Sequence, residues 1–216
     1  IKLCLNSDLA SEITLQPIKR FGFDGAVIFS DILMLPYGLG QTVKFEKNFG
    51  PKLGDIELQN IKNLNEIGFT EKVNKVYDAI AKTSNNPMMN SRDMIGFVGA
   101  PWTILVYMIN KSSPKKGLSD EFFKDDILIN ELMLIIEKFL KLHIKNQIEA
   151  GAKVIQIFDS WAGLLKNKIP EYIYLPTSNI VEYVKKLGVP VICFPRGIKD
   201  YKNFCDTVKP DAINID

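Results

Sequence analysis

The chain has 216 residues, of which 46% are hydrophobic, and carries 27 Lys and Arg against 25 Asp and Glu. This composition is typical of a globular protein with a packed core and excludes a disordered or collagen-like chain. A net charge of +2 is too small to indicate a nucleic-acid partner, and no apolar run reaches the about 20 residues that a membrane span needs. Three cysteines without a ligand or disulfide spacing, and no signal-peptide pattern, predict free thiols in the cytoplasm.

Strand-like and helix-like segments alternate along the chain. The strand-like runs are almost continuously apolar, as parallel strands covered on both faces are, and the segments between them repeat apolar residues about every 3.6 positions. In chain order, the predictions are a helix over 8–21 with Ser7 as its N-cap, a strand over 25–30, a short strand over 41–45, a helix over 70–83, a strand over 95–99, a helix starting near Pro101, a long helix ending before Gly151, a strand over 154–158, a helix ending before Gly188, and strands over 189–194 and 212–215.

Five buried strands joined by helical crossovers predict an α/β fold. Because such crossovers are right-handed, two architectures stay open, a doubly wound sheet and a (β/α)8 barrel. A complete barrel typically takes about 250 residues, so a barrel would lack three of its eight strands here.

Polar side chains follow the predicted strands, where sites in parallel α/β folds lie. They are Asp31, Asp159 with Ser160, Arg196 and Asp216. Taken singly, each Asp or Ser is more readily explained as the cap of a following helix. Taken together, the three aspartates could supply oxygen ligands to Mg²⁺.

Other kinds of site are disfavoured. The chain has one histidine, His143, which lies on the long predicted helix, so neither a zinc site nor a Ser-His-Asp triad is expected. The sequence Gly38-Leu39-Gly40 begins like a dinucleotide-binding motif, but position 43 is Val and the segment does not open a helix directly after a strand.

Four motifs carry a resemblance to a known family. They are TLQPIKRFG at 14–22, FSDIL at 29–33, GFVGAPWT at 96–103 and QIFDSWAG at 156–163. In this order they resemble the uroporphyrinogen decarboxylase family, and FPRG at 194–197 and DAINID at 211–216 extend the similarity through nearly the whole chain. The resemblance implies a single domain over residues 1–216 that is part of a (β/α)8 TIM barrel, covering about strands two to six.

The resemblance also implies a reaction. Family members convert the four acetate side chains of uroporphyrinogen III to methyl groups, giving coproporphyrinogen III in porphyrin and haem biosynthesis, without a cofactor. It places Asp31 against the central pyrrole N–H groups, where a carboxylate stabilises the protonated pyrrole intermediate. It makes Tyr107 a catalytic and substrate-binding residue and Ser160 a substrate-binding residue. A cytoplasmic homodimer acting on a small molecule, with no nucleic acid and no membrane partner, is implied as well.

The chain departs from the family pattern in its supply of cations. The arginine-rich segment of the family would precede Ile1 and its histidine-containing segment would follow Asp216, which leaves Arg20, Arg92 and Arg196. A polyanionic substrate needs guanidinium groups for paired carboxylate contacts.

Two other functions stay open at this point. One is a zinc-dependent methyltransferase of the same superfamily that acts on corrinoid or methylated substrates, which bound zinc would reveal. The other is an inactive barrel fragment that serves as a binding module, since missing strands leave open sheet edges.

Overall fold

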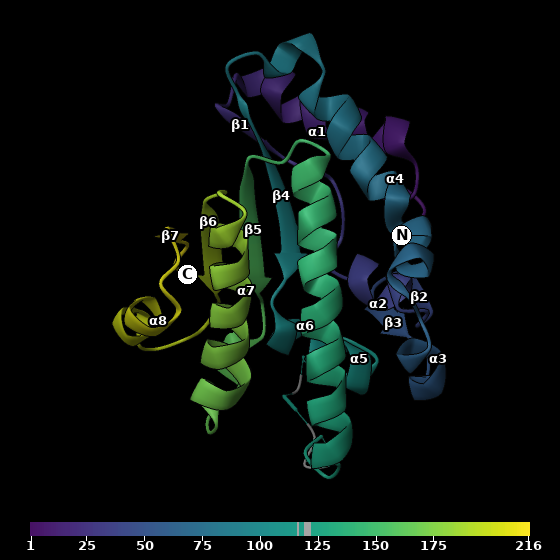
Figure 1. The fold of residues 1–216 in the computed structure, drawn as a ribbon, viewed down its shortest axis with the longest axis vertical. Helices are drawn as coiled ribbons and strands as arrows, with labels where there is room; N and C mark the ends of the chain where they lie inside the picture. The colour runs from purple at the N-terminus through teal and green to yellow at the C-terminus, as the bar shows by residue number, and fades with distance from the viewer. Residues whose placement is uncertain (116, 119–121) are drawn as a thin grey trace.

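Figure 1 shows the computed structural model, which describes residues 1–115, 117–118 and 122–216. Five strands form a parallel sheet in the order β1-β4-β5-β6-β7, and two more form a separate antiparallel hairpin. The sheet consists of β1 (Gly25–Val27), β4 (Asp93–Gly99), β5 (Val154–Asp159), β6 (Val191–Pro195) and β7 (Ala212–Ile213), and the hairpin of β2 (Val43–Glu46) and β3 (Gly50–Leu53).

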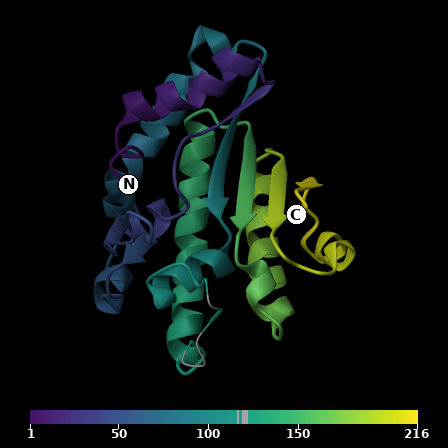
Figure 2. The ribbon, with the colours of Figure 1, turned by 180° about the vertical axis from the view of Figure 1, so that it is seen from behind.

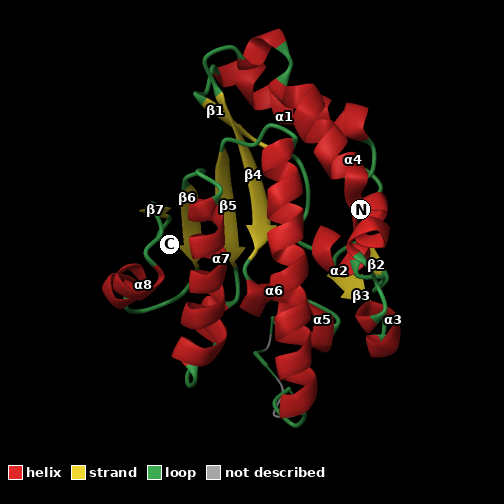
Figure 3. Ribbon diagram, in the orientation of Figure 1, coloured by secondary structure: helices red, strands yellow, loops and turns green. Residues whose placement is uncertain are grey.

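Helices connect successive strands of the sheet, as Figure 3 shows in red. The α-helices are α1 (Ser7–Phe21), α2 (Met34–Gly38), α3 (Leu58–Lys62), α4 (Glu66–Ser84), α5 (Pro101–Asn110), α6 (Asp126–Glu149), α7 (Leu175–Lys186) and α8 (Tyr201–Val208). Short 3₁₀ turns lie at Pro87–Met89 and Ala162–Leu164, and a π-helical turn at Pro170–Tyr174 leads into α7.

The sheet is a segment of a barrel. In Figure 1, α6 and α7 lie in front of the strands, and in Figure 2, seen from behind, the strands lie in front of these helices. A doubly wound sheet carries helices on both faces, whereas a barrel carries them on the outside alone. The predicted (β/α)8 fold class is therefore confirmed for this part of the barrel, with β1 and β7 at the two edges of the sheet.

The predicted start of the first helix is wrong by one residue. Asn6 is the N-cap, because its side-chain oxygen accepts a hydrogen bond from the Leu9 N–H at 3.1 Å, and Ser7 is already the first helical residue. The helix predicted over 70–83 begins earlier, at Glu66, because Asn65 caps it through the Gly68 N–H at 2.8 Å. Both caps are asparagines, which satisfy N–H groups that a helix start leaves free.

The predicted strand over 41–45 is half of a hairpin. It runs over Val43–Glu46 and pairs with β3, which the sequence analysis did not predict. The reason is that β3 contains Gly50 and Pro51, two residues that strand patterns disfavour. The first sheet strand is also shorter than predicted, since β1 ends at Val27.

Gln147 anchors the long helix α6 to the sheet. Its amide Nε2 donates to the Phe97 carbonyl at 3.0 Å, and its Oε1 accepts from the Phe97 N–H at 3.0 Å. A Cβ atom on Gly96 would lie 2.5 Å from that Oε1, so only glycine leaves room for the contact.

In the described part of the chain, no helix is long and apolar enough to cross a membrane.

Candidate active site at the ends of the strands

Asp31 follows β1 at the turn into α2. Its Oδ1 accepts a hydrogen bond from the Leu33 N–H at 2.8 Å, which closes a local turn. The N-cap of α2 is Leu33, so the explanation of Asp31 as the cap of the following helix is wrong. Burial raises the pKa of the Asp31 carboxyl, and the Leu33 N–H acts in the opposite direction. Its second oxygen has no hydrogen bond to the residues that the structure describes, and so can accept one from a ligand.

A cavity of about 730 Å³ opens beside Asp31. Its walls are the first four residues of the chain, the segment 29–31 and strand β2. Two lysines of these walls, Lys2 and Lys44, have no ion pair within the described ranges, whereas Glu46 is held by Lys52 at 2.6 Å. The cavity therefore combines one half-buried carboxylate with two uncompensated ammonium groups.

Tyr107 lies on α5 next to the segment that carries Asp31. Its side chain is buried in a small apolar cluster with Leu33 and Leu53, and its ring packs edge-on against Trp161 at a centroid distance of 5.9 Å. Val43 packs against the same cluster and also lines the Asp31 cavity, so the Tyr107 cluster and the cavity adjoin at Val43. Tyr107 itself does not line that cavity.

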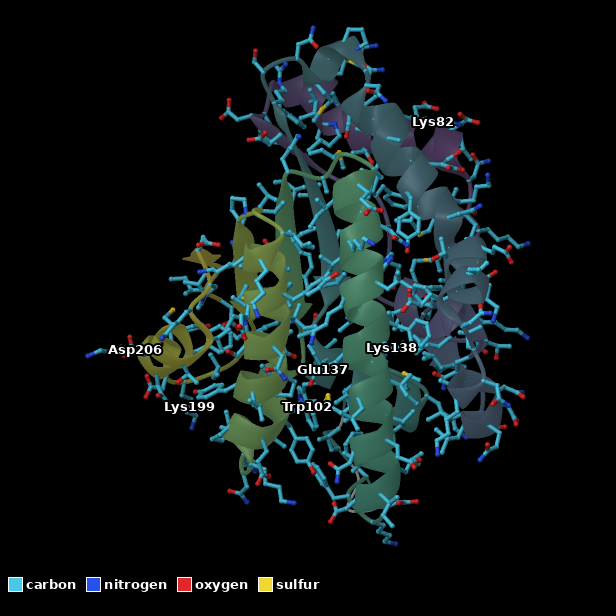
Figure 4. All side chains as sticks on the ribbon, in the orientation of Figure 1. Lys82, Trp102, Glu137, Lys138, Lys199 and Asp206 are labelled. Carbon is cyan, nitrogen blue, oxygen red and sulfur yellow. The ribbon has the colours of Figure 1, made fainter. Side chains whose placement is uncertain are left out.

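The turn after β5 is held by the residues that begin α5. The Thr103 hydroxyl donates to Asp159 Oδ1 at 2.6 Å and accepts from the Trp161 N–H at 3.0 Å. The indole Nε1 of Trp102, labelled in Figure 4, donates to the Trp161 carbonyl at 3.0 Å. Burial raises the pKa of Asp159 to about 7, against smaller lowering effects of the Thr103 hydroxyl and the Trp161 N–H.

Ser160 lies within this turn, between Asp159 and Trp161. Its side chain is half-buried and makes no hydrogen bond to any residue in the described ranges. The hydroxyl is therefore available to a ligand, but Ser160 does not line the cavity beside Asp31, and no hydrogen bond joins the two residues in the described part of the chain.

The FDSWAG and FPRG motifs meet through their glycines. The Gly163 N–H donates to the Arg196 carbonyl at 2.9 Å, and a Cβ on Gly163 would lie 2.6 Å from the Gly197 carbonyl oxygen. This backbone contact accepts no side chain on Gly163. Arg196 itself is exposed.

The magnesium hypothesis is wrong for these aspartates. Among the described residues, no three or more His, Cys, Asp or Glu side chains are grouped so that they could hold a metal ion. Asp159 is buried against Thr103, and Asp216 accepts hydrogen bonds from the Gly197 N–H at 3.1 Å and from the Tyr201 hydroxyl. The three carboxylates therefore serve separate local structures.

Comparison with known proteins gives a match along the whole chain. A family model described as uroporphyrinogen decarboxylase (URO-D) matches residues 1–216. The chain belongs to the uroporphyrinogen decarboxylase family. The proteins named uroporphyrinogen decarboxylase from Rickettsia bellii and Orientia tsutsugamushi are each 38% identical to it, over 222 and 226 residues.

These alignments cover 100% of this chain, which spans 65% and 64% of the length of the two relatives. Among solved structures, a methyltransferase from Methanosarcina mazei superposes with a TM-score of 0.68 at 14% identity, over 88% of this chain and 56% of that one. At this identity the likeness supports the shared fold alone.

Sequence reasoning about this uroporphyrinogen decarboxylase family member missed three residues at the site. Thr103 and Trp161 lie inside the quoted motifs, so the motifs contained a signal for them. No sequence signal indicated Lys44, because its place on the cavity wall depends on a hairpin whose second strand was not predicted.

Proposed function

We propose that the protein decarboxylates the four acetate side chains of uroporphyrinogen III, giving coproporphyrinogen III. The single observation that carries the proposal is the family match over residues 1–216, which contains the FSDIL aspartate at a cavity. The chemistry needs no cofactor if the substrate itself becomes the electron sink. We place this reaction in haem biosynthesis.

Loss of CO₂ from an acetate leaves an electron pair on carbon, which is unstable unless the pyrrole accepts it. Protonation of the pyrrole ring carbon creates that acceptor, and a fixed carboxylate stabilises the resulting cation. In our proposal Asp31 supplies the carboxylate. With Oδ1 occupied by the Leu33 N–H, the orientation of the carboxyl is set before the substrate arrives, and the second oxygen accepts pyrrole N–H groups.

Binding of those N–H donors also changes the proton balance of Asp31. Burial raises its pKa, so ionisation is less favourable in the empty site than in water. Several N–H donors and a positive pyrrole ring both favour the ionised form. We therefore expect substrate binding to lower the pKa of Asp31 from its value in the empty site.

The lysines of the cavity wall fit a substrate that carries several carboxylates. Lys2 and Lys44 flank Asp31 without partners of their own among the described residues. An unpaired ammonium group near the surface attracts an anion without first breaking an ion pair. We assign Tyr107 to the reacting ring and its carboxylate, and Ser160 to substrate binding.

The proposal extends to the state of the protein. Residues 1–216 form one domain as part of the barrel, the protein acts as a cytoplasmic homodimer, and its partner is a small-molecule substrate. A second function is not favoured, because the methyltransferase likeness concerns the fold.

The test uses the full-length protein, uroporphyrinogen III and exclusion of oxygen, with coproporphyrinogen III and CO₂ as readouts. Asp31→Asn and Asp31→Ala are expected to lower turnover by about 100-fold or more, the scale for removal of one fixed electrostatic contact. The matched control is Asp24→Asn, an exposed aspartate at the other end of β1. Undiminished turnover in the Asp31 variants would contradict the assignment, and an inactive wild-type protein would contradict the function.

A further inference from the structure

Asp159 is a buried carboxyl group of which one oxygen is hydrogen-bonded and the other is not. Its side chain is 3% exposed, Oδ1 accepts the Thr103 hydroxyl at 2.6 Å, and Oδ2 is buried without a hydrogen-bond partner among the described residues. A buried polar atom without a hydrogen bond is energetically unfavourable. An amide or an apolar side chain would avoid burying a titratable group, so the local packing alone does not explain an acid here.

The Thr103 hydroxyl links Asp159 to the turn that contains Ser160 and Trp161. One Thr103 hydroxyl bridges the Asp159 side chain and the Trp161 N–H, which encloses Ser160 in a closed turn. Trp102 holds the carbonyl of the same Trp161 from the other side. Two consecutive residues of α5 thus fix the backbone of Trp161.

The side chain of Trp161 packs against Tyr107. Its ring meets the Tyr107 ring at 5.9 Å and an interplanar angle of 63°. Its Nε1 is buried and has no hydrogen bond to the described residues, so nothing polar holds the indole apart from its backbone. The described contacts that hold Trp161 are therefore its packing on Tyr107 and the backbone turn that Thr103 and Asp159 close.

We propose that Asp159 is a positioning residue of the decarboxylase site, which acts through the Thr103 hydroxyl to set Ser160 and the Trp161–Tyr107 ring pair. The proposal rests on the proposed function. It assigns a role to the GAPWT and FDSWAG motifs, whose Thr103 and Asp159 lie 56 positions apart in the chain and meet only in the fold. Asp159 does not touch the substrate in this arrangement.

The surroundings of Asp159 allow a clean titration. On β6 the Cys193 thiol faces it, and burial, then the charge of Asp159, raise the pKa of that thiol far above neutrality. From α5 it meets Thr103, and from its own turn the Trp161 N–H, neither of which titrates. A change near pH 7 at this turn therefore belongs to Asp159, whose pKa is about 7.

The experiment compares four substitutions in the full-length protein. Thr103→Val removes the bridging hydroxyl, Thr103→Ser keeps it, and Asp159→Asn keeps an acceptor but cannot ionise. Thr83→Val is the matched control, because Thr83 is also fully buried and its hydroxyl bonds to the Ala79 carbonyl at 2.7 Å, on α4. The readouts are kcat, KM, and the ¹⁹F resonance of 5-fluorotryptophan at Trp161, assigned by its loss in Trp161→Phe.

We expect Thr103→Val to lower kcat/KM by about tenfold or more, since small displacements of reacting groups have effects of this size or larger. Thr103→Ser should restore it to within about threefold, and Thr83→Val should stay within about twofold of wild type. The Trp161 resonance should move in Thr103→Val but not in Thr83→Val. In wild type it should shift with a midpoint near pH 7, and in Asp159→Asn that shift should vanish.

Equal losses in Thr103→Val and Thr83→Val would overturn the proposal, because both would then act through stability. So would an unmoved Trp161 resonance in Thr103→Val, or a pH shift that persists in Asp159→Asn. The resonance needs no turnover, so an inactive wild-type protein with the expected spectra would overturn the decarboxylase function while supporting the positioning of Trp161.

Discussion

Acidification is expected to weaken the packing of α6 against α4 through a single buried histidine. His143 is 4% exposed, its Nδ1 lies 2.8 Å from the Tyr77 hydroxyl, and its ring packs edge-on against Phe69 at 6.1 Å. Burial lowers the pKa of His143 to about 4, from an ordinary value of about 6.5. The folded protein therefore holds this side chain neutral at pH values where the unfolded chain protonates it.

The sign and size of the effect follow from that difference. Between about pH 6.5 and 4 the unfolded chain binds one more proton at His143 than the folded protein, so the free energy of unfolding falls as the pH falls. The stabilisation is complete above the unfolded pKa and is lost on the way down to the folded one. At about 1.36 kcal/mol per pKa unit, the full loss is about 3 kcal/mol.

Asp159 has the opposite effect in the same pH range. Its pKa is about 7 in the folded protein against an ordinary value near 3.9, so here the folded state binds the extra proton and its contribution to stability rises as the pH falls. The two contributions are of similar size, so they offset each other in the wild-type protein. Single variants are needed to separate them.

The assay is urea unfolding of the full-length protein, followed by circular dichroism between pH 7 and 4.5. The quantity is the free energy of unfolding of wild type minus that of His143→Gln, a variant that keeps a hydrogen-bonding side chain for Tyr77. This difference should fall by about 2.5 kcal/mol over the range, whereas the same difference for Asp159→Asn should rise by about 3 kcal/mol. A His143→Gln difference that stays constant with pH would refute the argument that His143 is buried in its neutral form.

Three further outcomes are expected. Lys44→Ala should raise KM for uroporphyrinogen by about five- to tenfold with little change in kcat, because the ammonium group acts in binding. Lys75→Ala, on the outer surface, is the control and should leave kcat and KM within about twofold of wild type. An unchanged KM in Lys44→Ala would show that Lys44 is not part of the substrate site. Gly163→Ala should destabilise the protein by about 2 kcal/mol or more, since its Cβ would lie 2.6 Å from the Gly197 carbonyl oxygen. Thermal unfolding measures the difference, and a wild-type midpoint would contradict the close backbone contact. Gln147→Leu should cost about 2 to 3 kcal/mol in urea unfolding, because it leaves the Phe97 N–H and carbonyl unpaired, and a wild-type midpoint would contradict the anchoring role.

Local sequence signals determined much of the fold. Continuous apolar runs predicted the five strands of the sheet, because strands covered on one side by helices and on the other by barrel contents tolerate few polar residues. Helix ends were less accurate, since Asn6 and Ser7 are both good caps and only the backbone geometry selects between them. The order of strands and helices left a doubly wound sheet and a barrel open, the motif resemblance favoured the barrel, and the covering of one face by α6 and α7 confirms it.

At the site, the sequence by itself determined which residue types follow each strand and, through four motifs, the family of the chain. Only the tertiary structure decided what those residues do with one another. The spacing of Asp31, Asp159 and Asp216 allowed a metal site, yet the fold separates them, because each strand end carries its carboxylate into a different local turn. Conversely, Thr103 and Asp159 meet at 2.6 Å because two parallel strands end side by side, and a hydrogen bond between such distant residues has no sequence signal of its own.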